Sequence, residues 1–100
     1  MSQKTPDGHT RLHIWVKGRV QGVGFRAHVA YTGQSIGLGG WVRNVGWDRV
    51  EAMAEGDRAA LERFLEAVKA GPRGAQVDEA RADWETPTGE FDTFEVRHSI

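Results

Sequence analysis

Alternation of apolar and polar residues marks the first regular element of the chain. Leu12, Ile14 and Val16 point to one side of an extended backbone, and the residues between them point to the other. This pattern predicts a half-buried strand. The polar residues before it contain proline and glycine, so we interpret residues 1–10 as a flexible N-terminal arm and residues 11–100 as one domain.

Two later stretches have the period of an amphipathic helix. The first follows a glycine-rich segment and ends at Gly37, a residue that commonly stops helices. Its apolar stripe consists of Phe25, Val29, Thr32 and Ile36. The second helix is expected over residues 57–70, where Asp57 can cap the start and Gly71 and Pro72 end it. Its apolar face consists of Leu61, Phe64, Leu65 and Val68.

The remaining regular segments have the character of strands. Residues 40–44 and 49–54 are separated by a short turn through Gly46, which predicts a hairpin. A further strand is expected within residues 75–84. A last short strand is expected within residues 93–98, after a turn that contains proline and glycine.

The order of these elements predicts the fold class. Strand, helix, strand, strand, helix and strand, with an additional short strand last, is the α+β, ferredoxin-like split βαβ arrangement (βαββαβ). We expect an antiparallel sheet with two helices on one face and the other face open. This fold hosts many unrelated activities, so it does not by itself indicate a function.

Composition narrows the possible partners. Thirteen Lys and Arg nearly balance fourteen Asp and Glu, and the net charge of -1 gives no general attraction to nucleic acid or anionic membranes. There is no cysteine, which excludes disulfides and thiolate chemistry. The sequence has neither a long apolar run nor the apolar core of a signal peptide. We therefore expect a cytoplasmic monomer that binds neither nucleic acid nor membrane.

The segment between the first strand and the first helix is suited to binding an anion. Three glycines in residues 18–24 let the backbone turn sharply and expose its N–H groups. The N-terminus of the next helix adds further N–H groups and a partial positive charge. Arg26 lies in the first helical turn, where a cation is unfavourable for the helix, so its position suggests a ligand that needs the charge. An ordinary glycine-rich turn beside a solvated arginine remains the alternative at this level.

Two motifs carry a resemblance to a known family. The segment Gly18-Arg19-Val20-Gln21-Gly22-Val23-Gly24-Phe25-Arg26 resembles the active-site signature of the acylphosphatase family. The segment Gly40-Trp41-Val42-Arg43-Asn44, followed by Val50-Glu51 and by Gly56, is similar to the second signature of that family. The two segments have the family's spacing, and the resemblance extends roughly from Leu12 to Arg97.

The resemblance implies an enzyme that hydrolyses small acyl phosphates to a carboxylate and inorganic phosphate, with no metal and no cofactor. It implies that Arg26 is the catalytic arginine and that Asn44 positions the attacking water. It also implies that the backbone of one loop holds the phosphoryl group. The residues of that loop are Gly18, Arg19, Val20, Gln21, Gly22, Val23 and Gly24.

The side-chain alternation of the second motif supports this assignment independently. Val42 and Asn44 share one face of their strand, and Val42 is the natural core residue. Asn44 is therefore expected on the helix-covered side, near the end of the strand. Arg26 begins the first helix on that same side, so the two side chains are expected to converge at one rim of the sheet.

The turn after Asn44 departs from the family pattern. Asp48 stands where the family usually has glycine, which predicts that Gly46 supplies the unusual backbone angle instead. Trp47, expected to be exposed in this turn, would alter access to the site.

The main alternative is a non-enzymatic ferredoxin-like binding module for RNA or an acyl phosphate. RNA-recognition domains of this layout stack bases on the open sheet face, where Trp15, Trp41 and Met53 fall by alternation. Glu51 and Glu55 fall on the same face and oppose that reading. Among other candidates, His28 lies close enough in sequence to the loop to touch a substrate, and Arg43 is interpreted as a solvated strand residue.

Overall fold

A computed structural model describes residues 8–100 of the chain. Most of the expected N-terminal arm, residues 1–7, lies outside the described residues. The first strand begins at His9, three residues before Leu12, where the alternating pattern starts, so His9 and Thr10 belong to the strand and not to the arm.

The elements occur in the predicted order. They are β1 (His9–Arg19), α1 (Phe25–Ile36), β2 (Gly39–Val45), β3 (Arg49–Asp57), α2 (Arg58–Ala70), β4 (Gln76–Glu85) and β5 (Phe94–Val96). Gly37 ends α1 in the left-handed conformation with a φ of 87°, as expected for a helix stop. Asp57 occupies the capping position of α2, but its side chain makes no capping hydrogen bond.

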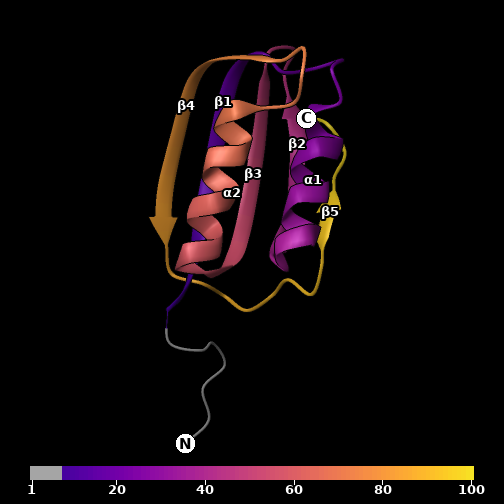
Figure 1. Cartoon of the computed structure of the whole chain (residues 1–100). Helices are drawn as coiled ribbons and strands as arrows, with labels where there is room; N and C mark the ends of the chain where they lie inside the picture. Colours follow the sequence, from indigo (N-terminus) through magenta and orange to yellow (C-terminus); the bar gives the residue numbers. More distant parts are fainter. Residues whose placement is uncertain (1–7) are drawn as a thin grey trace, which may run out of the picture.

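The strands form one sheet in the order β4-β1-β3-β2-β5. The strand pairs β1·β3, β1·β4 and β2·β3 are antiparallel, as predicted, whereas β5 pairs parallel with β2. The predicted antiparallel sheet is confirmed for β4, β1, β3 and β2, and β5 makes the sheet mixed by adding a parallel edge strand. After β4, the chain runs past the lower ends of the strands in Figure 1 to the opposite edge of the sheet. It therefore enters β5 in the same direction as β2.

Both helices pack against one face of the sheet and build the core there (Figure 1). Leu12, Ile14 and Val16 of β1 all point to this face, as their alternation predicted. The largest fully buried side chains are Phe25, Phe64, Leu12, Ile14, Leu61, Val16, Val20, Val29, Val42, Val50 and Val68. Asn44 has the same parity on β2 as the core residue Val42, so the helix-covered side is where its side chain belongs.

Side chains partly cover the sheet face that carries no helices. Trp41 is buried on it, with the guanidinium carbon of Arg43 4.7 Å from its ring centroid. Glu51, which is only 8% exposed, accepts hydrogen bonds from Arg43 Nε at 2.8 Å and from His13 Nε2 at 2.6 Å. Arg43 is thus a partner of a buried carboxylate, and its interpretation as a solvated residue is wrong.

A second buried carboxylate, Glu55, anchors the connection between β4 and β5. Its oxygens accept hydrogen bonds from the backbone N–H groups of Thr88 and Gly89, each at 2.9 Å, and Arg11 Nη1 lies 3.5 Å from Oε2. Buried carboxylates require such partners because they lose water on folding. This anchoring holds the 86–93 connection against the end of the sheet opposite the glycine-rich loop.

Candidate active site

The glycine-rich segment divides between a strand and a loop. Gly18 and Arg19 still belong to β1 and pair with β4 across a bulge at residues 17 and 18. Gly18 has a φ of 142°, and a Cβ atom there would collide with the carbonyl oxygen of Gln76. Here glycine permits two backbones to approach closely and does not end the strand, so the loop proper is residues 20–24.

The loop turns into α1 through two left-handed glycines. Gly22 has a φ of 73° and Gly24, the capping residue of α1, a φ of 76°. The His28 N–H group donates to the Gly24 carbonyl at 3.0 Å, so the N–H groups of residues 25–27 have no intrahelical acceptor. No side chain caps this helix end, and its first turn has no acidic residue. The end is therefore suited to binding an anion.

These groups open on one hollow of about 290 Å³. Its lining residues are Val20, Gln21, Gly22, Gly24, Phe25, Arg26, Ala27, Asn44 and Val96. The hollow joins the loop, the first turn of α1, the end of β2 and the edge strand β5. Arg26 and Asn44, expected to converge from their strand and helix positions, line the same hollow.

Arg26 brings a positive charge that no carboxylate of residues 8–100 neutralises. The ion pairs among these residues involve other cations. A planar guanidinium presents a fork of donors that matches two phosphate oxygens. Together with the helix N-terminus, it makes the hollow suited to a phosphoryl group.

Asn44 contributes an unpartnered acceptor. Its Oδ1 atom is buried and has no hydrogen-bond donor among residues 8–100. A buried polar atom without a partner costs about 1–3 kcal/mol, and such atoms are uncommon in folded proteins. Because the residue Asn44 lines the hollow, this unpartnered acceptor is suited to a small donor such as water.

A comparison with protein families decides the identity. The family model described as acylphosphatase matches residues 12–96. The chain belongs to the acylphosphatase family. It is accordingly an enzyme of the hydrolase class that acts on small acyl phosphates.

Individual relatives agree with this membership. The chain is 46% identical to an acylphosphatase of Anaeromyxobacter dehalogenans over 87 residues, which is 87% of this chain and 94% of that relative. It superimposes on the crystal structure of acylphosphatase from Bacillus subtilis with a TM-score of 0.84 and 38% identity, covering 88% of this chain and 98% of that one. An acylphosphatase structure from Coxiella burnetii gives a TM-score of 0.88 and 32% identity, with 97% and 100% covered.

Not every residue of the acylphosphatase loop motif lines the hollow. Gly18 and Arg19 do not line this hollow but a neighbouring one, and Val23 packs against the core. His28, whose sequence position suggested a substrate contact, instead places its Nε2 atom 3.4 Å from the Ala67 carbonyl of α2. Its ring therefore faces the second helix.

Gln21 has a role that sequence reasoning missed. Its Nε2 atom donates to the carbonyl oxygens of Gly46 at 3.1 Å and Arg49 at 2.9 Å, with Val45 at 3.5 Å. Gly46 lies in the turn between β2 and β3, and Val45 and Arg49 are the strand residues that flank it. Gln21 therefore connects the glycine-rich loop to the turn that follows Asn44. A glutamine in a loop carries no local signal for partners 24 to 28 residues away.

We expect Gln21→Ala to weaken the binding of inorganic phosphate by about tenfold, because one or two lost hydrogen bonds of about 1 kcal/mol loosen the loop. Isothermal titration calorimetry measures this affinity. Gln34→Ala is the matched control, since Gln34 Nε2 also donates to a backbone carbonyl, that of Phe94 at 2.9 Å, away from the loop. Equal phosphate affinity in both variants would show that Gln21 does not position the loop.

The turn itself confirms one expectation. Gly46 takes the left-handed conformation with a φ of 61°, while no described residue other than glycine has a positive φ, so Asp48 does not need the angle. Trp47, the next residue of the turn, is 84% exposed, which agrees with the exposed position expected from the sequence.

Residues 8–100 contain neither a cluster of metal-ligating side chains nor a membrane-spanning helix. Their His, Asp and Glu side chains form no group of three or more placed to hold a metal ion. None of the helices in this range is long and apolar enough to cross a membrane.

Proposed function

We propose that the hollow between the loop and β2 hydrolyses the carboxyl–phosphate bond of acyl phosphates without a metal ion. Arg26, the N–H groups of the loop and those at the start of α1 bind the phosphoryl oxygens. Asn44 Oδ1 accepts a hydrogen bond from the attacking water. The observation that carries this proposal is the buried, unpartnered Asn44 oxygen in the same hollow as the Arg26 side chain.

The proposed step is an in-line displacement at phosphorus. The water oxygen forms a bond to phosphorus while the bond from phosphorus to the carboxyl oxygen breaks, and the electron pair of that bond leaves with the carboxylate. One water proton moves to a phosphate oxygen of the substrate, so the products are a carboxylate and inorganic phosphate. The residues that line the hollow include no carboxylate and no histidine, which supports the substrate as its own proton acceptor.

The absence of a carboxylate or histidine in this lining also restricts which leaving groups the substrate can have. Without a proton donor, the departing oxygen must be stable as an anion. A carboxylate meets this condition because its conjugate acid has a pKa of about 4, whereas the pKa of a phenol is about 10. Positioning and charge stabilisation, which Arg26 and the backbone amides supply, are the main requirements of phosphoryl transfer.

Hydrolysis of benzoyl phosphate in the presence of EDTA tests the proposal, with ultraviolet absorbance as the readout. We expect rapid turnover that EDTA does not reduce, and no measurable turnover of phenyl phosphate, which has a similar ring and a poor leaving group. Equal turnover of the two substrates would contradict the leaving-group argument. Loss of activity in EDTA, restored by a divalent cation, would contradict the metal-free mechanism.

We further propose that the enzyme acts as a cytoplasmic monomer without nucleic acid. One chain supplies every residue of the hollow. The stacking platform of the RNA-binding alternative is compromised, because Trp41 is only 7% exposed and Glu51 and Glu55 place carboxylates on the same face. Light scattering after size exclusion checks the mass. Retention on single-stranded RNA at moderate salt would revive the alternative.

A further inference from the structure

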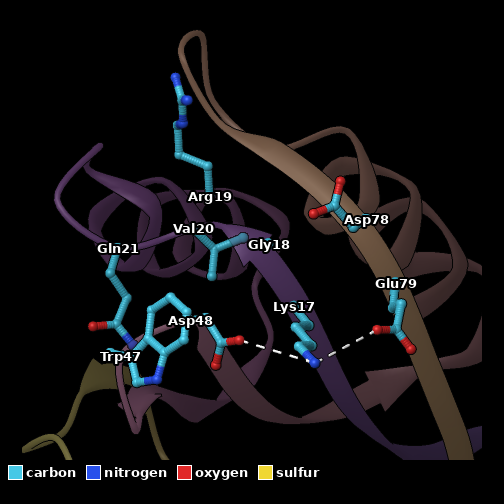
Figure 2. Close-up of a pocket in the computed structure, with 9 residues that line it drawn as sticks. All are labelled: Lys17, Gly18, Arg19, Val20, Gln21, Trp47, Asp48, Asp78 and Glu79. Carbon is cyan, nitrogen blue, oxygen red and sulfur yellow. Dashed lines mark ion pairs between the residues drawn. The ribbon is translucent and has the colours of Figure 1, made fainter.

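A second hollow of about 440 Å³ adjoins the first. Its lining residues are Lys17, Gly18, Arg19, Val20, Gln21, Trp47, Asp48, Asp78 and Glu79 (Figure 2). Val20 and Gln21 line both hollows, so the two hollows adjoin at these residues. The volume lies within the range of about 300–1,000 Å³ that small-molecule sites occupy.

Trp47 is the aromatic residue in the lining of this hollow. The indole lies beside the Gln21 side chain (Figure 2), which is bonded to the backbone of the same turn. With 84% of its surface exposed, Trp47 is the most exposed large hydrophobic residue in the described part of the chain. A flat aromatic surface so open to water gains by covering itself with another flat group.

The charges of the second hollow are biased towards negative. Lys17 Nζ lies 4.0 Å from Asp48 Oδ2 and 3.9 Å from Glu79 Oε2, so its charge is already shared by two carboxylates (Figure 2). Asp78 adds a third carboxylate, whose Oδ1 accepts a hydrogen bond from Gln76. The Arg19 side chain extends away from the hollow (Figure 2). The lining thus carries three carboxylates against the two cations Lys17 and Arg19, and Arg49 Nε, 3.9 Å from Asp48 Oδ1, offsets part of this excess.

We infer that this hollow is the subsite for the acyl group, and that it selects flat, uncharged acyl groups that stack on Trp47. The inference rests on the proposed function, because the phosphoryl group must occupy the first hollow. The acyl end of the substrate then crosses Gln21 and lies over Trp47. An acyl group that carries a further carboxylate or phosphate meets the excess of carboxylates and is disfavoured.

The first test is the ratio of kcat/KM for benzoyl phosphate to that for acetyl phosphate, which cancels effects on the shared phosphoryl group. We expect Trp47→Ala to lower this ratio by about tenfold, given about 1.4 kcal/mol for a stacked aromatic pair. Trp47→Phe should largely keep the ratio. Tyr31→Ala, which removes an aromatic residue that is 72% exposed on α1 and lines neither hollow, should keep it fully. An unchanged ratio in Trp47→Ala would overturn the subsite.

The second test addresses charge. Wild-type kcat/KM should be about fivefold lower for 4-carboxybenzoyl phosphate than for benzoyl phosphate, because the extra carboxylate lies near like charges in a water-filled hollow. Glu79→Gln should narrow that gap, and high salt should narrow it too. A gap that Glu79→Gln and salt leave unchanged would show that the carboxylates of the hollow do not face the acyl group.

Binding of analogues that cannot be hydrolysed separates the subsite from the reaction. In calorimetry, benzoylphosphonate should bind more tightly than acetylphosphonate to the wild type, and Trp47→Ala should lose that preference. If the wild type hydrolyses neither acyl phosphate but shows this preference, the proposed reaction fails and the aromatic subsite stands. If it hydrolyses both substrates and both phosphonates bind alike, the reaction stands and the subsite fails.

Discussion

Arg26→Ala should lower kcat/KM for benzoyl phosphate by about 10³- to 10⁵-fold, the range for arginines that stabilise a transferring phosphoryl group. The guanidinium lines the hollow beside the helix N-terminus and has no carboxylate partner among residues 8–100. Its charge is thus available to the substrate. Initial rates at several substrate concentrations measure the loss. The binding of inorganic phosphate should weaken in the same variant.

Two further arginine variants make this result specific. Arg26→Lys keeps the charge but loses the planar fork, so its activity should fall between the wild type and Arg26→Ala. Arg63→Ala removes an exposed arginine of α2 that lies outside the hollow, and full activity is expected. A folded Arg26→Ala protein with near-normal turnover would remove Arg26 from the mechanism.

Asn44→Ala should lower kcat by about 10²- to 10³-fold, which is typical for the loss of one preorganised polar group. In contrast to Arg26→Ala, it should leave the affinity for inorganic phosphate nearly unchanged, because the amide acts on the water and not on the phosphoryl oxygens. The measurement is kcat together with the inhibition constant of phosphate. A variant that loses phosphate affinity and keeps kcat would assign Asn44 to phosphate binding.

The same substitution makes an unusual prediction for stability. Asn44 Oδ1 has no donor among residues 8–100, so truncation to alanine breaks no hydrogen bond between that oxygen and another of these residues, and it removes a poorly solvated polar atom. We expect the melting temperature of Asn44→Ala to equal or exceed that of the wild type. Thermal unfolding followed by circular dichroism measures it. A marked fall in melting temperature would indicate a structural role for the side chain.

Local patterns in the sequence predicted the helices, the strands and the side of the sheet on which Asn44 lies. Alternation in β1 and β2 placed Leu12 and Val42 in the core, and so placed Asn44 on the helix-covered side. The helical period located both helices, and the glycines before Phe25 located the start of α1. These features depend on neighbours within a few residues, which is why the chain order alone reveals them.

Local sequence patterns could not distinguish the different structural roles of the glycines in the 18–24 segment. Gly18 was interpreted as the start of the loop, yet it lies in β1 where the backbone of β4 comes too close for a side chain. Gly22 and Gly24 do supply the left-handed turn that a loop requires. The same residue type serves two purposes, and only the position of Gln76, far along the chain, distinguishes them.

The sequence by itself thus determined the family, the order of elements and the side of the sheet on which Arg26 and Asn44 meet. Only the tertiary structure decided that β5 runs parallel to β2 and that Gln21 connects the loop to the β2–β3 turn. It also decided that Glu55 is buried beneath Thr88, 33 residues away, and that a second hollow adjoins the first. These features depend on segments distant in sequence that meet only when the core has packed, so no local periodicity encodes them.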